Sequence, residues 1–271
     1  MKPWQSLILL ILFELVDMAQ QTKKTIRSLE KSFRIVDALV AEGPSGVTEL
    51  ANHLDLNKTT VYHHLSTLES ADYVVKEDNK YKPGLRFFEI GQHTRRQHEI
   101  YNVGKPEVDK LANETGELAN LMVAEKGLGT YIYISRGENA IHLDTKMGTR
   151  QYLHTSALGK SILANMTPEA REAVIDHHGL PKETENTVTD EKELASEIRE
   201  IQESGVAYDG EERAEGIRCI ASPIADKDGS LLGAVSVSGP STRLSDERLF
   251  ETMPRKVKNT AEIIGINASY R

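Results

Sequence analysis

The stretch LANHLDLNKTTVYHHLSTLESADYVV, residues 50–75, constrains the fold of this chain more than any other. Apolar residues recur at helical spacing on both sides of a short polar turn, LDLN, so we expect two helices that cross at that turn. Ala51 and Val61 stand ten residues apart, where such a crossing needs one small and one branched side chain. The segment therefore predicts a helix-turn-helix.

The flanking segments extend this motif. Upstream, residues 25–43 show apolar residues at helical spacing, ended by Gly43-Pro44: Ile26, Leu29, Phe33, Val36 and Leu39 or Val40. Thr48 is the expected cap of the helix that follows. Downstream, YVVKEDNKYKPG alternates like a two-stranded ribbon that turns at Asp78-Asn79. The order predicts a winged helix-turn-helix; the alternative is a small helical interaction domain with a solvated polar face.

The third helix, from about Lys58, has an apolar face and a polar face. Val61, Leu65 and Leu68 form the expected buried stripe. The opposite face offers hydrogen-bond donors, acceptors and methyl groups suited to phosphates and base edges, and free N–H groups at the helix start suit a phosphate oxygen. The candidate DNA-binding residues are Asn57, Lys58, Thr59, Thr60, Tyr62 and His63.

Net charge is unevenly distributed along the chain. Residues 23–100 contain 12 Lys and Arg against 11 Asp and Glu, whereas residues 101–271 contain 20 against 28. The net charge of -8 therefore belongs to the C-terminal part, and the candidate DNA reader is near neutral. This asymmetry favours a two-domain protein with one nucleic-acid face.

The first two dozen residues include an apolar run, SLILLILFELV, that is too short to span a bilayer. It lacks the flanks and cleavage pattern of a secretory signal. An upstream start assigned in error, with Met18 as the natural beginning, is the interpretation we favour. The alternatives are an amphiphilic extension that packs on a partner, and a signal or anchor. The single cysteine, Cys219, excludes an internal disulfide and suits a reducing cytoplasm.

After a helix over about residues 85–104, the pattern becomes mixed. Strands are expected over 118–125, 129–136, 140–147, 206–209, 218–226 and 231–240. Helices are expected over 107–116, 156–166, 167–179, 189–205 and from about 244 to 266. Strands, helices, strands and a final helix, with hairpins throughout, predict an α+β sensory domain on an antiparallel sheet.

Three features of this domain suggest a ligand site. The segment SALGK, residues 156–160, opens a helix with small residues that leave backbone N–H groups accessible to an anion. Asp209 ends one strand and Cys219 follows on another. Ser236 and Ser238 share one strand face, although on spacing alone an exposed sheet face is the more common explanation of such a pair. For Cys219 the alternative is a small buried apolar residue. No metal-ligand spacing, phosphate loop or nucleophile motif appears.

Together, these residues resemble the IclR family of transcriptional regulators. The resemblance covers residues 25–266 and rests on VTELANHLDLNKTTVYHHLSTLESADYV, LHTSALGKSILA, GVAYDGEERAEGIRCIASPI and GAVSVSGP, in that order. It implies a winged helix-turn-helix joined by a helix to a GAF/profilin-like effector domain. The expected divisions are an extension over 1–24, a DNA-binding domain over 25–86, and a linker helix with effector domain over 87–271.

The resemblance also implies a pocket, an assembly and a class of ligand. By motif match, the effector-binding residues are Met147, Ala157, Leu158, Asp209, Cys219, Ser236 and Ser238. Homodimers, often paired into tetramers, are expected on palindromic double-stranded operators, with small organic acids or aromatics as effectors. The family often has Arg where this chain has His63, so a fixed positive charge is missing from the reading face.

We therefore predict a cytoplasmic, sequence-specific transcription regulator whose operator affinity is modulated by a small metabolite. No enzymatic activity, cofactor, metal or membrane association is expected. Serine hydroxyls and helix N–H groups suit a carboxylate, and Asp209 suits a ligand hydroxyl or hydrated carbonyl, so a hydroxy or keto acid is favoured over a bulky aromatic. The alternatives are a C-terminal domain that turns over its ligand at Cys219, and an architectural DNA binder without an effector.

Overall fold

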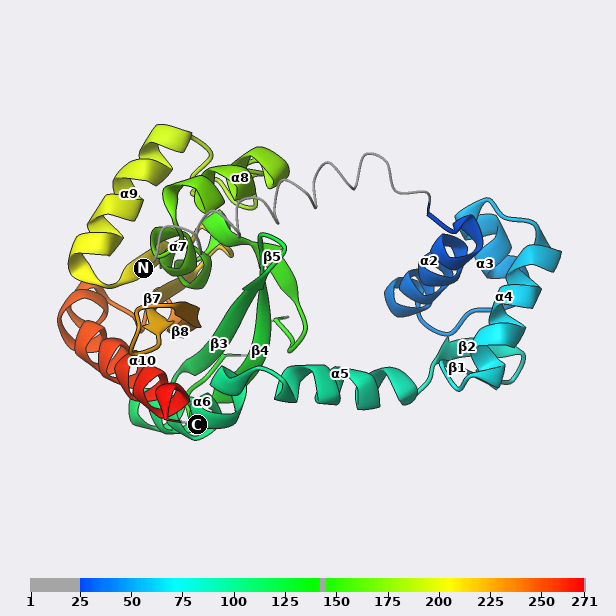
Figure 1. Ribbon diagram of the computed structural model, residues 1–271, viewed down its shortest axis with the longest axis horizontal. Coiled ribbons are helices and arrows are strands. Elements are labelled where there is room, and N and C mark those ends of the chain that lie inside the picture. Colours follow the sequence, from blue (N-terminus) through cyan, green and yellow to red (C-terminus); the bar gives the residue numbers. More distant parts are fainter. Residues whose placement is uncertain (1–24, 142–144, 271) are drawn as a thin grey trace. The chain divides into compact units, whose positions relative to one another are not determined.

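The computed structural model describes residues 25–141 and 145–270, and this part of the chain divides into two compact units between Gln97 and His98 (Figure 1). Our prediction for the N-terminal extension lies outside the described residues. Helix α5 (Arg86–Arg96), grouped with the C-terminal part from the sequence, belongs to the first unit by this division.

The N-terminal unit is a winged helix-turn-helix. Its elements are α2 (Arg27–Glu42), α3 (Val47–Leu54), α4 (Lys58–Ser70), β1 (Val74–Glu77), β2 (Lys80–Pro83) and α5. Asp55 adopts a left-handed backbone conformation after α3, which turns the chain into α4. Asp78 and Asn79 both have positive φ, 47° and 64°, as the tight turn of a two-stranded wing requires. The expected turn at Asp78-Asn79 is confirmed.

The three helices and the wing enclose a small apolar core. Ala51 and Val61 are both buried in it, as their spacing predicts. Its buried members are Ile35, Ala38, Leu39, Leu50, Ala51, Val61, Leu65, Val74 and Tyr81.

The predicted cap of α3 is wrong, whereas the predicted helix over residues 25–43 is confirmed as α2. Helix α3 starts at Val47 rather than after Thr48, and the Glu49 carboxylate accepts a hydrogen bond from the Gly46 N–H at 2.9 Å. The apolar face of α2 is only partly buried, because the helix packs on the core through Ile35, Ala38 and Leu39. Four other apolar side chains of this segment stay exposed: Ile26, Leu29, Phe33 and Val40.

The C-terminal unit is built on a six-stranded antiparallel sheet of order β5-β4-β3-β8-β7-β6. Its strands are β3 (Leu118–Glu125), β4 (Leu128–Arg136), β5 (Arg150–Tyr152), β6 (Ala207–Gly210), β7 (Ile217–Ala225) and β8 (Leu231–Pro240). Its helical elements are α6 (Glu99–Thr115), η1 (Leu153–Thr155), α7 (Ala157–Ala164), α8 (Pro168–His178), α9 (Glu191–Ser204), the π-helical turn η2 (Arg248–Thr252) and α10 (Met253–Ser269). The predicted α+β class is confirmed.

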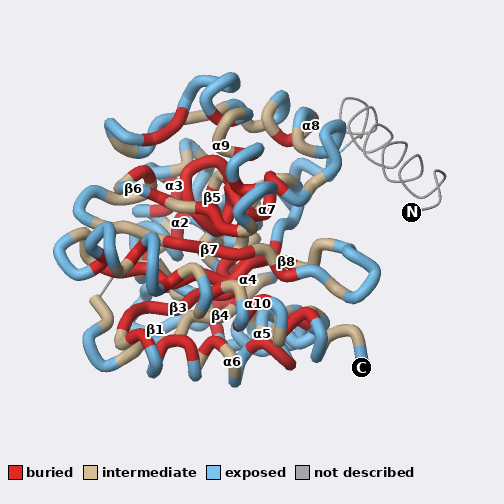
Figure 2. Tube along the Cα trace, turned by 90° about the vertical axis from the view of Figure 1, so that its left-hand side faces the viewer, coloured by how far each residue is buried: buried red, intermediate tan, exposed pale blue. Residues whose placement is uncertain are grey.

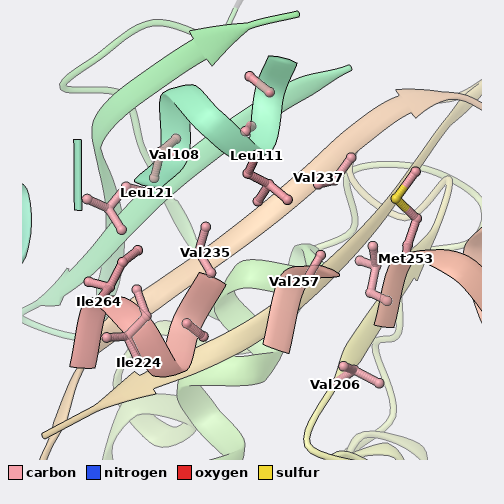
Figure 3. Packing of buried hydrophobic residues seen from close by; sticks show 14 of the residues in the cluster. Val108, Leu111, Leu121, Val206, Ile224, Val235, Val237, Met253, Val257 and Ile264 are labelled. Carbon is pink, nitrogen blue, oxygen red and sulfur yellow. The ribbon is translucent and has the colours of Figure 1, made fainter. Parts of the chain in front are cut away.

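Helices cover both faces of this sheet, so its two central strands, β3 and β8, are buried along much of their length (Figure 2). On one face, α6 and α10 pack against Leu121, Val235 and Val237 (Figure 3). On the other face, α7 and α9 pack against Met122, Ala221 and Ala234. Because side chains alternate along a strand, the polar residues of β8 fall on the face that α7 covers.

One strand of this unit was expected in the wrong place. Residues 140–141 and 145–147 form no strand, and residues 142–144 lie outside the described residues. The third strand after α6 is instead β5, which pairs with the start of β4. Just before β5, the described residues Lys146–Thr149 form a turn in which the Thr149 N–H donates to the Lys146 carbonyl at 3.0 Å. No helix in the described ranges is both long enough and apolar enough to cross a membrane.

Candidate ligand cavity and DNA-reading helix

The start of α4 presents the candidate DNA-binding residues. Lys58, Thr59, Tyr62 and His63 are exposed, and Thr60 is half-buried. Asn57 caps the helix, because its side-chain oxygen accepts a hydrogen bond from the Thr59 N–H at 2.8 Å. The Asn57 side chain therefore fixes the start of the helix, and the side chains of Lys58 and Thr59 that follow it face solvent. The Tyr62 and His63 rings meet edge to face at 5.8 Å.

The wing contributes three lysines beside this helix. Lys80 lies 3.5 Å from Glu49, and Lys82 lies 2.7 Å from Glu77. Lys76 lies over the ring of Tyr81 at 5.5 Å. Exposed ion pairs of this kind contribute about 0–1 kcal/mol, so phosphates can replace the carboxylates as partners at little cost.

In the C-terminal unit, sheet register brings the predicted pocket residues together. Asp209 of β6 pairs with Cys219 of β7, and Cys219 pairs with Ser238 of β8. One step along, Ser236 pairs with Asn120 of β3. Because paired residues of an antiparallel sheet point to the same face, these polar groups form one patch beneath α7.

A cavity of about 180 Å³ opens over this patch, here called the effector cavity. Six of the seven predicted effector-binding residues line it, at the start of α7 and on three strands: Ala157, Leu158, Asp209, Cys219, Ser236 and Ser238. The seventh, Met147, is 54% exposed and is not among the described residues that line the cavity. Further lining residues, which we did not predict, include Asn120, Tyr131 and Arg213.

Asn120 orients the serine pair. Its side-chain nitrogen donates to Ser236 Oγ at 3.1 Å and to Ser238 Oγ at 3.2 Å. Each hydroxyl therefore accepts from Asn120 and keeps its own hydrogen to donate. Both serines are at most 5% exposed, so the alternative of an exposed sheet face is wrong. The side-chain oxygen of Asn120 is buried without a partner among the described residues.

Helix α7 directs backbone N–H groups at the same cavity. Ser156 caps the helix: its Oγ accepts from the Gly159 N–H, and its carbonyl accepts from the Lys160 N–H. The N–H groups of Ala157 and Leu158 precede these and have no acceptor within the helix. Donors at a helix start favour a negatively charged group by about 0.3–1 kcal/mol.

Asp209 is the acceptor of the cavity. Its Oδ1 accepts from the Glu212 N–H at 2.7 Å, and its Oδ2 is buried without a partner among the described residues. Burial, together with the nearby Glu212 carboxylate, raises the pKa of Asp209 to about 7. A ligand group that donates a hydrogen bond would satisfy the open oxygen.

Lys160 does not face the cavity. Its ammonium lies 2.7 Å from Glu197 and 2.7 Å from Glu212, and the residue is 1% exposed. Burial alone would lower the pKa of Lys160, but the two carboxylates outweigh burial and raise the pKa above its usual value. The lysine therefore stays charged. It ties α7 to α9 and to the loop after β6.

Cys219 has none of the features of a catalytic nucleophile. Burial, and then the Asp209 carboxylate, raise the pKa of its thiol well above the usual range, whereas nucleophilic cysteines have lowered pKa values. No histidine is among the described residues that line the cavity. The part of the chain that the structure describes also contains no cluster of three or more metal-binding side chains.

Two family models match the chain. Residues 28–78 match the IclR helix-turn-helix domain, and residues 92–266 match the C-terminal domain of the bacterial transcriptional regulator IclR. A probable HTH-type transcriptional regulator, ArcR of Halobacterium salinarum, is 31% identical over 90% of this chain and 94% of its own. The transcriptional regulator KdgR of Escherichia coli is 30% identical over 84% of this chain and 87% of its own.

Solved structures agree in fold. IclR of Thermotoga maritima superposes with a TM-score of 0.76 at 30% identity, over 91% of this chain and all (100%) of its own. An IclR homologue from Microbacterium hydrocarbonoxydans, crystallised with 4-hydroxybenzoate, superposes with a TM-score of 0.78 at 19% identity, over 90% of this chain and 100% of its own. At that identity the second likeness concerns the fold alone.

A winged helix-turn-helix followed by an α+β domain with a ligand-sized cavity defines a DNA-binding transcription regulator with an effector domain. The chain belongs to the IclR family of transcriptional regulators. The relatives named above are described as transcriptional regulators, and the raised pKa and burial of the Cys219 thiol give no support to the alternative of turnover there.

Proposed function

We propose that this regulator binds palindromic operator DNA through α4 and the wing, and that a small organic acid in the effector cavity changes its operator affinity. One observation carries the effector half of this proposal. Hydroxyl and N–H donors from β8 and α7 converge on one cavity that also contains a buried, half-satisfied carboxylate, Asp209. Such a site suits a ligand with both a carboxylate and a hydroxyl or hydrated carbonyl.

The volume of the cavity favours a small effector. A protein cavity of about 150 Å³ holds a benzene molecule, so about 180 Å³ holds a compound of similar size. The 4-hydroxybenzoate of the Microbacterium homologue likewise combines a hydroxyl with a carboxylate. A compact hydroxy or keto acid fits this chain better than a larger aromatic acid.

For the DNA half, the exposed side chains from Lys58 to His63 supply phosphate and base-edge contacts. A palindromic operator requires two copies whose reading helices lie about one helical turn, or a multiple, apart. Exposed apolar side chains in α2 and α5 and at their N-caps provide surfaces for pairing: Ile26, Leu29, Phe33, Val40, Leu85 and Phe88. We therefore propose a homodimer or tetramer, acting in the cytoplasm where the operator lies.

The test is an effector-dependent change in operator binding. Genome-wide mapping of bound sites supplies the operator, and fluorescence anisotropy then measures its affinity with and without two- to six-carbon hydroxy and keto acids. The double variant Ser236→Ala/Ser238→Ala should lose the response but keep basal operator binding, because the serines lie in the other unit. Ser230→Ala, at an exposed position in the turn between β7 and β8, is the control. An unchanged response midpoint in the folded double variant would refute the cavity as the effector site.

A further inference from the structure

Arg213 gives the effector cavity a positive charge. It lies on the loop between β6 and β7, and among the described lining residues only Arg213 and Asp209 carry charged side chains. The Arg213 side chain is 34% exposed, whereas Ser236 and Ser238 are at most 5% exposed. The guanidinium therefore lies where the cavity opens towards solvent, and the serine donors lie at its closed end.

A buried glutamine fixes the orientation of this guanidinium. Gln151 is 6% exposed, and its side-chain oxygen accepts from Arg213 Nε at 3.1 Å and from the Tyr131 hydroxyl at 3.1 Å. Its side-chain nitrogen donates to Ser156 Oγ, the cap of α7. Reversing the amide would set its nitrogen against the Arg213 Nε–H, which can only donate, so this contact determines the orientation. Gln151 is thus a positioning residue for Arg213.

The outer nitrogens of Arg213 are weakly engaged. Within the described chain they form one ion pair, from Nη1 to Glu183 Oε2 at 3.9 Å, the long limit for such a contact. Both side chains are about a third exposed, at 34% and 38%, and a solvated pair of this length contributes little stability. A ligand carboxylate can therefore take the place of Glu183. A guanidinium binds a carboxylate through two parallel N–H···O bonds, which adds directional selectivity.

We propose that Arg213 binds a second carboxylate, so that the effector is a hydroxy- or oxo-dicarboxylic acid. This inference rests on the proposed function, in which the first carboxylate meets the serine hydroxyls and the N–H groups of α7. Asp209 then accepts the hydroxyl between the two acidic ends. A four- to six-carbon diacid matches a cavity of about 180 Å³, since about 150 Å³ accommodates a six-carbon ring. With a monocarboxylic acid, the outer nitrogens of Arg213 would keep only their long contact to Glu183 among the described residues.

Isothermal titration calorimetry on the full-length protein tests this with two series of 2-hydroxy acids of three to six carbons, with and without a terminal carboxylate. The wild-type protein should bind the best diacid about tenfold or more tightly than the monoacid of equal length, as expected for charged hydrogen bonds. Arg213→Gln should remove this preference. Arg213→Lys keeps the positive charge but cannot form two parallel hydrogen bonds to one carboxylate, so it should retain part of the preference. Gln151→Ala should lower the ratio of diacid to monoacid affinity, because Arg213 then loses the acceptor that orients it.

The matched control is Arg150→Gln, which removes one positive charge from the exposed neighbour of Gln151 on β5. It should keep the full preference for diacids. Equal affinity of wild-type protein for both series would overturn the role of Arg213 even if an Arg213 variant failed to fold. Persistence of the preference in Arg213→Gln would do the same. Failure of both series to bind would overturn the proposed effector class itself, which distinguishes the two failures.

Discussion

The substitution Asp209→Asn should make the protein more stable at alkaline pH and remove a pH dependence from its unfolding. Burial, then the Glu212 carboxylate, raise the pKa of Asp209 from 3.8 to about 7. Between these values the unfolded chain releases a proton that the folded chain keeps. The free energy of unfolding of the wild-type protein therefore falls as pH rises from about 4 to 7, and stays lowered above that range.

The size of the effect follows from the shift. Each pKa unit corresponds to about 1.4 kcal/mol, so a shift from 3.8 to about 7 sets an upper limit of about 4 kcal/mol. Burial also raises the pKa of Glu212, although the contact with Lys160 lowers it. Ionisation of Glu212 therefore costs free energy in the folded protein as well. Relaxation of Glu212 in the variant adds to the gain at alkaline pH. The relative gain of Asp209→Asn between pH 4.5 and 8 should be about 2–4 kcal/mol.

Urea unfolding followed by circular dichroism at each pH measures this difference. The N-terminal unit is the same in both proteins, so the difference between their curves reports the C-terminal unit. Asp176→Asn, which changes an exposed carboxylate on α8, is the control and should follow the wild-type protein. If the free energies of unfolding of Asp209→Asn and wild type differ by a constant amount from pH 4.5 to 8, the pKa of Asp209 is not raised in the folded protein and the reasoning fails.

Two further predictions concern the N-terminal unit. Lys58→Ala should weaken binding to all operator variants alike and lower the salt slope by about 1, whereas Thr60→Ala or His63→Ala should change the preference between variants. Anisotropy titrations at several salt concentrations measure both effects, with Lys192→Ala on α9 as the matched charge control. Unchanged binding by the folded variants would contradict the assignment. The double variant Leu85→Glu/Phe88→Glu should shift sedimentation towards the monomer and weaken operator binding. Both apolar side chains are exposed in one copy of the chain, at 85% and 64%, and are therefore available to a second copy. A wild-type protein that sediments as a monomer at working concentration would contradict pairing.

The elements predicted best from the sequence are those fixed by short-range patterns. The helix-turn-helix follows from apolar spacing within about two dozen residues, and the wing turn follows from Asp78-Asn79, residues that tolerate positive φ. The placement of Asp209 and Cys219 on successive strands is equally local, and the structure shows that the intervening loop lets these two strands pair. The exposed apolar face of α2 shows the limit of this reasoning. Periodicity identifies a face that needs covering, but it does not say whether this unit or another copy covers it.

The residues that prediction missed reach the cavity over long sequence separations. Asn120 orients two serines that lie more than a hundred positions later, and its own surroundings, LANLMVAE, read as an ordinary strand. Arg213 stands in a charged loop, DGEERAEG, where a solvated arginine is the usual expectation. Gln151 gives it a fixed orientation, and β5, which carries Gln151, was itself expected a few residues upstream. Motif matching located the floor of the cavity because it lies in regular strands and at a helix start. Arg213 and Gln151, to which we attribute the choice of ligand, lie on a loop and on an edge strand, where only the folded chain brings them together.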